Sequence, residues 1–341
     1  MRYDVIIVGA GQAGSAVAAG LRQSGFDGSV LLIGDEPHQP YERPPLSKGV
    51  LLNTLDIERC QLRPLSFWAD KAIELCLGTR VVAIDSARQC IQLDDGGWLE
   101  YGQLVWAAGG HARRLTLPHA EQTHVLRTLD DALRLKAALQ PASRVVVIGG
   151  GFIGLESAAA LAQLGHSVTV IEQQPHLLSR VSAPVVGEYF LRAHTAHGVD
   201  VVLNADVDAL LLNQAQQVNA VLLADGQQID ADIVLAGIGF TAATEPLAQV
   251  GLASAQGVLV DEYCQTTDPH IFAVGDCALS VQPFARHLGV TRVESVQNAM
   301  DQARTVVKTL LGNPEPYAGL PWFWSDQYDI KFQTVGISAG Y

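Results

Sequence analysis

Residues 4–34 read DVIIVGAGQAGSAVAAGLRQSGFDGSVLLIG, and residues 144–172 follow the same plan as RVVVIGGGFIGLESAAALAQLGHSVTVIE. Each copy has an apolar strand rich in β-branched residues, a glycine turn, an Ala-rich stretch of helical length and a second apolar strand. Strands that are apolar throughout and are joined by a helix are typical of a parallel sheet covered on both faces. The repeat therefore predicts an α/β fold with two similar units.

Each copy also carries the pattern GxGxxG between its first strand and its helix. The glycines are Gly9, Gly11 and Gly14 in the first copy and Gly149, Gly151 and Gly154 in the second. In such a turn the first glycine permits a tight bend, the second lets backbone N–H groups approach a pyrophosphate, and the third lets helix and strand pack closely. The helix N-terminus adds a partial positive charge. Two copies in this context predict two dinucleotide-binding sites.

Acidic residues follow the second strand of each copy, where a carboxylate holds the adenosine ribose of a dinucleotide. In the second copy this residue is Glu172, which would also repel a 2′-phosphate, and positions 173 and 174 are Gln rather than Arg. We therefore expect the second unit to bind NADH in preference to NADPH. In the first copy the equivalent place falls on Gly34, and of the two acids that follow, Asp35 and Glu36, we favour Asp35.

Two further acids stand at positions where strand, turn and helix meet. Glu156 is expected in the first turn of the helix after the second glycine loop. The residues alone leave two interpretations open for it, compensation of the helix dipole or contact near the nicotinamide end of the ligand. Asp276 follows a predicted strand over 271–276 and precedes a helix, where a carboxylate can hold the hydroxyl groups of a ligand.

Composition narrows the class of protein further. The chain has 341 residues, 48% of them apolar and 17% charged, which suits two or three domains with buried cores. The net charge of −13 argues against nucleic acid or an anionic membrane as the main partner. No apolar run reaches the ~20 residues that a membrane helix needs. The five cysteines show no spacing typical of a metal site or redox disulfide, so we expect no metal and a reducing, cytoplasmic location.

Motifs outside the glycine turns resemble the NADH-dependent ferredoxin reductases, the reductase components of bacterial aromatic-ring dioxygenase and P450 systems. These motifs are PYERPPLSK at 40–48, VGDCA at 274–278, RVESVQNA at 292–299 and PWFWSDQ at 321–327. The resemblance covers the whole chain and implies a fold like that of glutathione reductase. An FAD-binding domain (1–113 and 241–319) would be interrupted by an NAD-binding domain (114–240). Residues 320–341 would begin a C-terminal α+β domain, which we expect to be truncated.

The resemblance also implies how FAD would be held. The residues that match positions around the cofactor are Arg43, Lys48, Val82, Arg127, Asp276, Glu294 and Trp324. Lys48 and Glu156 would form a catalytic pair beside the isoalloxazine, where an ammonium stabilises the anionic reduced flavin and a facing carboxylate tunes that field. Val82 and Arg127 would contact the adenylate half and Asp276 the ribityl chain, with Glu294 and Trp324 beside the flavin ring.

The activity implied is that of an NADH:ferredoxin oxidoreductase. Hydride would pass from NADH to FAD, and single electrons would pass from FAD to a [2Fe–2S] ferredoxin, because a flavin converts two-electron into one-electron transfer. Rubredoxin as acceptor, and a redox-sensing flavoprotein resembling apoptosis-inducing factor, remain as alternatives. The absence of a redox Cys pair counts against disulfide reductases. A homodimer is left open.

Overall fold

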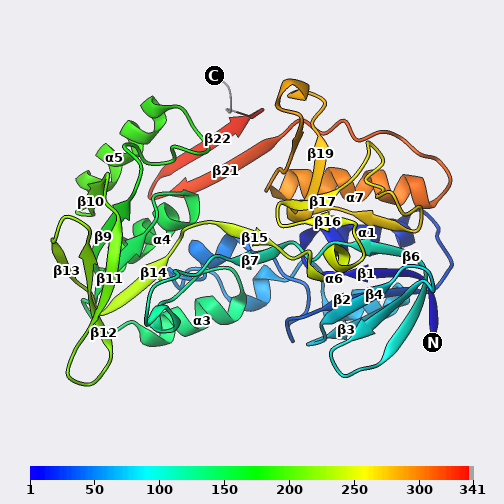
Figure 1. The fold of residues 1–341 in the computed structure, drawn as a ribbon, viewed down its shortest axis with the longest axis horizontal. Coiled ribbons are helices and arrows are strands. Elements are labelled where there is room, and N and C mark those ends of the chain that lie inside the picture. Colours follow the sequence, from blue (N-terminus) through cyan, green and yellow to red (C-terminus); the bar gives the residue numbers. More distant parts are fainter. Residues whose placement is uncertain (338–341) are drawn as a thin grey trace.

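Residues 1–337 are described by this computed structural model, in which two α/β lobes lie side by side (Figure 1). The first lobe is built on a seven-stranded sheet of order β3-β2-β1-β6-β5-β4, in which β18 also pairs with β6. Its strands are β1 (Arg2–Val8), β2 (Val30–Gly34), β3 (Ile73–Leu77), β4 (Val81–Asp85), β5 (Cys90–Leu93), β6 (Trp98–Trp106) and β18 (Ile271–Ala273). Strands β1, β2, β3, β6 and β18 are parallel, and β4 and β5 extend the sheet as antiparallel strands.

The centre of this sheet is buried on both faces, as the continuous apolar runs predict. All five residues of β2 are buried, and so are the last four of β1. Helices α1 (Gln12–Gln23) and α7 (Val296–Leu310) pack together against the sheet. Gly20 of α1 lets the two helices come close, because a Cβ there would lie 3.0 Å from a methyl group of Val307.

The second lobe is built on a four-stranded, fully parallel sheet of order β10-β9-β8-β14. Its strands are β8 (Arg144–Ile148), β9 (Ser167–Glu172), β10 (Asp200–Leu203) and β14 (Ile233–Ala236). Its helices are α3 (Leu129–Ala138), α4 (Phe152–Gln163) and α5 (Pro184–Ala196). A three-stranded antiparallel sheet, β11 (Val207–Leu212), β12 (Val218–Leu223) and β13 (Gln228–Asp230), completes the lobe. The two repeats thus form separate parallel sheets.

The chain passes between the lobes twice, at two short strands that pair with each other. These are β7 (Gly110–Ala112) and β15 (Phe240–Ala242), which run antiparallel. Gly110 is required there, since a Cβ would lie 2.1 Å from the carbonyl oxygen of Thr241. The outgoing and returning segments therefore form one two-stranded connection (Figure 1).

The remaining elements lie around the first lobe and between the lobes. They are α2 (Leu65–Asp70), α6 (Glu245–Gln249), β16 (Ala253–Ser254), β17 (Gly257–Leu259), β19 (Ala278–Val281), β20 (Val290–Thr291), β21 (Trp322–Gln327) and β22 (Ile330–Val335). The hairpin β21–β22, red in Figure 1, contacts α4 in one lobe and α7 in the other. The last four residues of the expected segment 320–341 lie outside the described residues. Within residues 1–337, no helix has the length and apolar character needed to cross a bilayer.

Candidate active site

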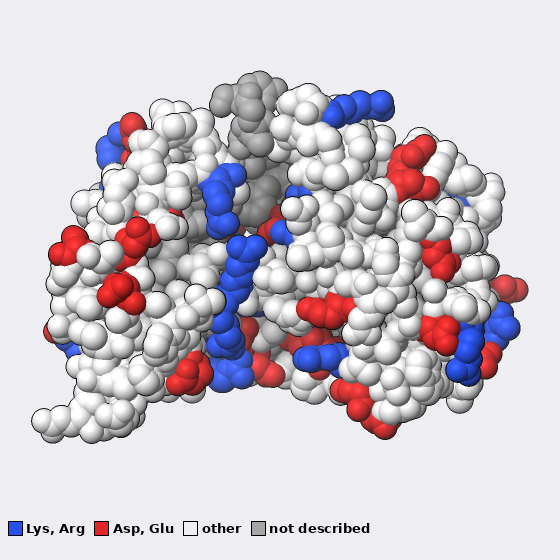
Figure 2. All heavy atoms as spheres, viewed as in Figure 1, with Lys and Arg blue, Asp and Glu red and all other residues white. Residues whose placement is uncertain are grey.

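A cavity of about 1540 Å³ lies between the two lobes and is lined by both glycine loops. Single-ligand pockets usually measure roughly 300–1,000 Å³, so this cavity has room for more than one nucleotide. Figure 2 shows the hollow between the lobes with Lys and Arg side chains along it. Among the expected site residues, only Gly14 and Gly154 do not line the cavity.

Gly14 and Gly154, the third glycines of the two loops, pack against the loops themselves. A Cβ on Gly14 would lie 1.9 Å from the carbonyl oxygen of Gly9, and one on Gly154 would lie 2.1 Å from that of Gly149. The second glycines are different, because a Cβ on Gly11 or Gly151 would meet no protein atom within 4 Å. Both loops therefore leave backbone open toward the cavity, and this shape fits the pyrophosphates of FAD and of a nicotinamide nucleotide.

Glu172 ends β9 beside the second glycine loop. Its carboxylate accepts hydrogen bonds from the backbone N–H of Gly150 at 2.6 Å and of Gln174 at 2.8 Å. These two bonds orient the side chain at the cavity wall. Each carboxylate oxygen keeps a further lone pair with which it can accept a bond from a ribose hydroxyl.

The two acids after β2 have different surroundings. Glu36 accepts hydrogen bonds from Arg43 Nη2 at 2.7 Å and from the Tyr41 hydroxyl at 2.6 Å, so both of its oxygens have protein partners. Asp35 is exposed and lines the cavity. This geometry favours Asp35 as the acid that meets the ribose in the first lobe.

Lys48 and Glu156 form an ion pair of 2.7 Å between Nζ and Oε2, at the place where the lobes meet. Glu156 is 2% exposed, and its carboxylate also accepts hydrogen bonds from the hydroxyl of Ser47 at 2.5 Å and of Ser325 at 2.7 Å. Lys48 donates in addition to the carbonyl oxygen of Pro44 at 3.3 Å. The buried carboxylate thus has three donors, one of which is the ammonium that it holds at the cavity wall.

The expected position of Glu156 in the first helical turn is wrong. Gly151 has an extended backbone, so α4 begins only at Phe152 and its first turn contains no acid. Glu156 lies one turn deeper and is buried among hydroxyl groups and an ammonium. Compensation of the helix dipole is therefore not its role in this structure.

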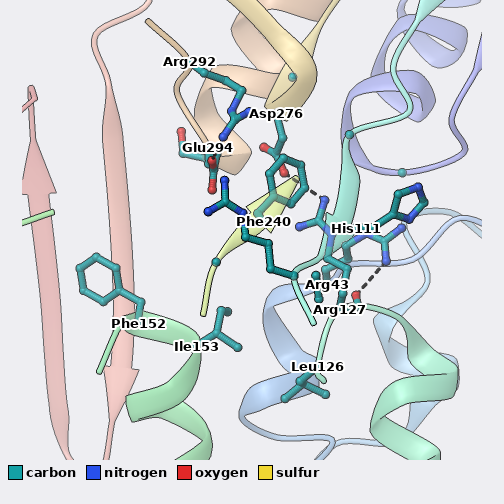
Figure 3. Close-up of a pocket in the computed structure, with 18 of the residues that line it drawn as sticks. Arg43, His111, Leu126, Arg127, Phe152, Ile153, Phe240, Asp276, Arg292 and Glu294 are labelled. Atoms are coloured by element: carbon teal, nitrogen blue, oxygen red, sulfur yellow. Dashed lines mark hydrogen bonds and ion pairs between the residues drawn. The ribbon is translucent and has the colours of Figure 1, made fainter. Parts of the chain in front are cut away.

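A second group of side chains lines the cavity (Figure 3). Arg127 pairs with Asp276 at 3.1 Å, and Arg292 pairs with Glu294 at 2.7 Å. The Phe240 ring contacts both guanidinium groups, since its centroid lies 4.8 Å from Arg127 Cζ and 5.1 Å from Arg292 Cζ. Arg127 and Asp276, which the resemblance assigns to different halves of FAD, thus contact each other here.

Sequence reasoning missed several residues of this cavity. Arg292 opens the motif RVESVQNA, but no sequence pattern marks Phe240, whose ring lies between two cations. Trp322 lies in the motif PWFWSDQ but was not among the expected site residues; it lines the cavity and stacks on Trp324, with 5.2 Å between the ring centroids. Alternate strand residues share a face, and this spacing could have found it. The side chains of Val82 and Trp324 line the cavity and make no hydrogen bond to the described part of the protein, so no contact indicates a particular role for them.

The thiol groups stand apart from this chemistry. All five cysteines are free, and burial raises the pKa of the Cys277 thiol to about 12, so it stays protonated beside Asp276. Residues 1–337 contain no group of three or more His, Cys, Asp or Glu side chains arranged to hold a metal ion.

Comparison with known proteins shows which family the chain belongs to. The family described as pyridine nucleotide-disulphide oxidoreductase matches residues 3–303. The chain belongs to the pyridine nucleotide-disulphide oxidoreductase family. It is 46% identical to a ferredoxin–NAD(P)⁺ reductase of Sphingomonas, over 99% of this chain and 82% of that protein. It is 40% identical to a ferredoxin–NAD⁺ reductase component of a 3-phenylpropionate/cinnamic acid dioxygenase from Photorhabdus laumondii, over 97% and 83%.

Solved structures extend the same comparison to the fold. The chain superposes with a TM-score of 0.95 on putidaredoxin reductase in its covalent complex with putidaredoxin, at 40% identity over 99% of this chain and 82% of that one. These comparisons confirm the α/β fold class and the family resemblance. The oxidoreductase is therefore an FAD enzyme that uses a nicotinamide nucleotide.

Proposed function

We propose that this oxidoreductase takes hydride from NADH and passes single electrons to a [2Fe–2S] ferredoxin that serves an oxygenase. The observation that carries the proposal is the Lys48–Glu156 ion pair, at the wall of one cavity that both glycine loops line. The ferredoxin as acceptor is supported by relatives named as ferredoxin reductases and by the putidaredoxin complex. An oxygenase system is supported by the dioxygenase component from Photorhabdus laumondii.

FAD, when bound, receives an electron pair from NADH and gives up electrons singly. The protein supplies position and electric field. The first loop and Asp35 would hold the adenosine end of FAD, and Arg127 and Asp276 would lie along its middle. Lys48 places a positive charge at the cavity wall, and because it is held there in advance by Glu156, no reorganisation is needed when negative charge develops.

Preference for NADH is the finer part of the proposal. Glu172 would accept hydrogen bonds from the ribose and repel a 2′-phosphate, and Gln173 and Gln174 offer that phosphate no cation. The bonds from Gly150 and Gln174 support this role, because they hold the carboxylate rigidly beside the loop.

We also propose the division of the chain into an FAD-binding domain, 1–113 and 241–319, an NAD-binding domain, 114–240, and a third domain beginning at 320. The pairing of β7 with β15 near both crossing points supports these bounds. A cytoplasmic location is supported by the five free thiols, since disulfides are rare there.

The test uses the purified full chain. We expect a yellow protein whose denaturation releases FAD rather than FMN, and cytochrome c reduction by NADH that depends on added ferredoxin. NADPH should support a much lower rate. A protein that binds FAD but reduces cytochrome c equally with and without ferredoxin or rubredoxin would contradict the proposed acceptor.

A further inference from the structure

A buried chain of hydrogen bonds leads from Glu156 through the hairpin β21–β22 to α5. Ser325 donates to Glu156 Oε1 at 2.7 Å, and Gln327 Nε2 donates to Ser325 Oγ at 3.1 Å. Gln327 Oε1 lies 2.8 Å from His194 Nε2, and the Tyr328 hydroxyl lies 3.0 Å from His194 Nδ1. These hydrogen bonds join α4, the hairpin β21–β22 and α5. Ser325 and Gln327 belong to the motif PWFWSDQ, but the resemblance places neither of them beside the cofactor.

The members of this chain are shielded from water. Ser325 and His194 are each 0% exposed, and Gln327 is 1% exposed. Buried polar groups are costly unless they are hydrogen-bonded, and here each has a partner on both sides. Nonpolar side chains would fill the interface between the hairpin and α5 without needing hydrogen-bond partners, so the buried polar side chains there need a physical explanation.

The direction of the chain is fixed by its end at Glu156. A carboxylate only accepts, so Ser325 must donate to it and accept from Gln327. This turns the Gln327 amide so that its oxygen faces His194, and His194 must then donate through Nε2–H. Nδ1 is left as the acceptor for the Tyr328 hydroxyl. Every bond in the chain thus points its positive end toward Glu156, and the tautomer of His194 follows from the network.

The imidazole has the protonation state that this direction needs. Burial lowers the pKa of His194, its bond to Gln327 raises it, and the nearby His197 lowers it. Tyr328 is half-buried and stacks on His197 with a distance of 3.7 Å between the ring centroids, and its burial raises the pKa of its hydroxyl to about 12. At neutral pH His194 is therefore neutral and Tyr328 keeps its proton.

We propose that Ser325, Gln327 and His194 are positioning residues, which hold the Glu156 carboxylate against Lys48 by a one-way chain of hydrogen bonds with the His194 proton on Nε2. The effect on the flavin rests on the proposed function, since Lys48 acts on FAD only if FAD binds beside it. The existence and direction of the hydrogen-bond chain do not depend on that function. Its donors align dipoles toward the anion, and hydrogen bonds in such a chain reinforce one another.

The first test examines the hydrogen-bond chain in the protein without nucleotide. We expect ¹⁵N-histidine NMR of the full-length protein at neutral pH to show His194 neutral, with its proton on Nε2. The His194→Gln variant identifies the His194 resonances, because they are missing from its spectrum. A proton on Nδ1, or a charged imidazole, would overturn the proposed direction whatever the enzyme does.

The second test examines the effect on Lys48 in the FAD-loaded protein. Gln327→Met keeps the side-chain length but breaks the chain, and Ser325→Ala removes one donor to Glu156. We expect about fivefold slower flavin reduction at saturating NADH, the change that ~1 kcal/mol for one hydrogen bond produces, with NADH Kd changed less than twofold. The flavin midpoint potential should fall, because a loosened Lys48 stabilises reduced flavin less.

Ser280 and Gln282 provide a matched control. Gln282 Nε2 donates to Ser280 Oγ at 3.0 Å, both side chains are buried, and neither lines the cavity. Ser280→Ala and Gln282→Met should leave the rate of flavin reduction and the flavin midpoint potential unchanged. If Gln327→Met does not fold, Ser325→Ala decides alone. Folded variants with wild-type rate and potential would overturn the positioning role, whereas a wild type that NADH does not reduce would instead contradict the proposed function.

Discussion

At Glu172 one carboxylate is placed both to recognise a ribose and to repel a 2′-phosphate. Glu172→Gln removes the charge and keeps a single acceptor oxygen, so only one of the backbone N–H groups of Gly150 and Gln174 retains its acceptor. We expect the preference for NADH over NADPH, measured as the ratio of kcat/KM, to narrow by about tenfold, as ~1.4 kcal/mol of repulsion is lost. Glu188→Gln, an exposed position in the same lobe, should leave it unchanged. Equal use of NADH and NADPH by the wild type would show that Glu172 does not select the nucleotide.

Replacing Lys48 tests the contribution of the buried Lys48–Glu156 ion pair. Lys48→Met leaves the Glu156 carboxylate buried without its cation, so the free energy of unfolding should fall by about 3 kcal/mol and flavin reduction by NADH should slow. Chemical denaturation and stopped-flow absorbance measure the two effects. Lys136→Met is the control, because that ammonium donates to a backbone carbonyl at 2.9 Å and does not line the cavity. Unchanged flavin reduction in Lys48→Met would remove Lys48 from the catalytic site.

Individual site residues were predictable where a motif carries its own geometry. The glycines and Glu172 follow from the repeat, and the Lys48–Glu156 contact follows from the resemblance. The bond from Ser325 to Glu156 joins residues 169 positions apart, and His194 to Gln327 joins residues 133 apart. Such contacts depend on how the hairpin docks, and one sequence holds no local pattern for them.

The two glycine loops allow a test at the level of single elements. A Cβ at Gly14 would collide with the Gly9 carbonyl, whereas one at Gly11 would meet only open space. We expect Gly14→Ala to lower the melting temperature of the protein with or without FAD. Gly11→Ala should leave the melting temperature of the flavin-free protein nearly unchanged and weaken FAD binding, measured by flavin fluorescence. Normal FAD affinity in Gly11→Ala would show that the pyrophosphate does not approach this loop.

Elements with strong periodicity were predicted well. The strands and helices of both repeats appear where expected. Helix α7, Val296–Leu310, follows Ser295, whose hydroxyl caps it by accepting a hydrogen bond from the N–H of Asn298. The antiparallel sheet β11–β12–β13 was not predicted. Its strands are short and half-exposed, so their apolar pattern is weak.

At the scale of the molecule, charge is distributed unevenly. The chain carries a net charge of −13, and the cavity between the lobes is lined by seven Lys or Arg side chains and eight Asp or Glu side chains. Figure 2 shows a row of Lys and Arg side chains along the hollow on this face, with Asp and Glu side chains beside it and on the outer surfaces. An acidic ferredoxin would be attracted to that row of cations.

Salt should therefore affect the two half-reactions differently. Raising salt from about 10 to about 150 mM shortens the Debye length from about 30 to about 8 Å, which should slow electron transfer to ferredoxin severalfold. Reduction of the flavin by saturating NADH should change little, because that step follows binding. Stopped-flow rates of each half-reaction measure this, with a neutral dye as control acceptor. A ferredoxin rate that is independent of salt would rule out steering by the cavity.

The two-lobed architecture was predictable because the strand–glycine turn–helix–strand pattern occurs twice in the sequence. The relative placement of the lobes was not, since it depends on the β7–β15 pairing and on the hairpin that contacts α4 and α7. The site lies at that junction, and this is why its glycine loops were foreseen and its contacts between lobes were found only in the structure.

The most direct test of the central claim follows both half-reactions without oxygen. One equivalent of NADH should bleach the flavin of the FAD-loaded protein. Mixing with an oxidised [2Fe–2S] ferredoxin should then restore the flavin absorbance while two ferredoxins are reduced for each NADH consumed. A flavin that NADH does not bleach, or a reduced flavin that leaves ferredoxin oxidised, would contradict the account.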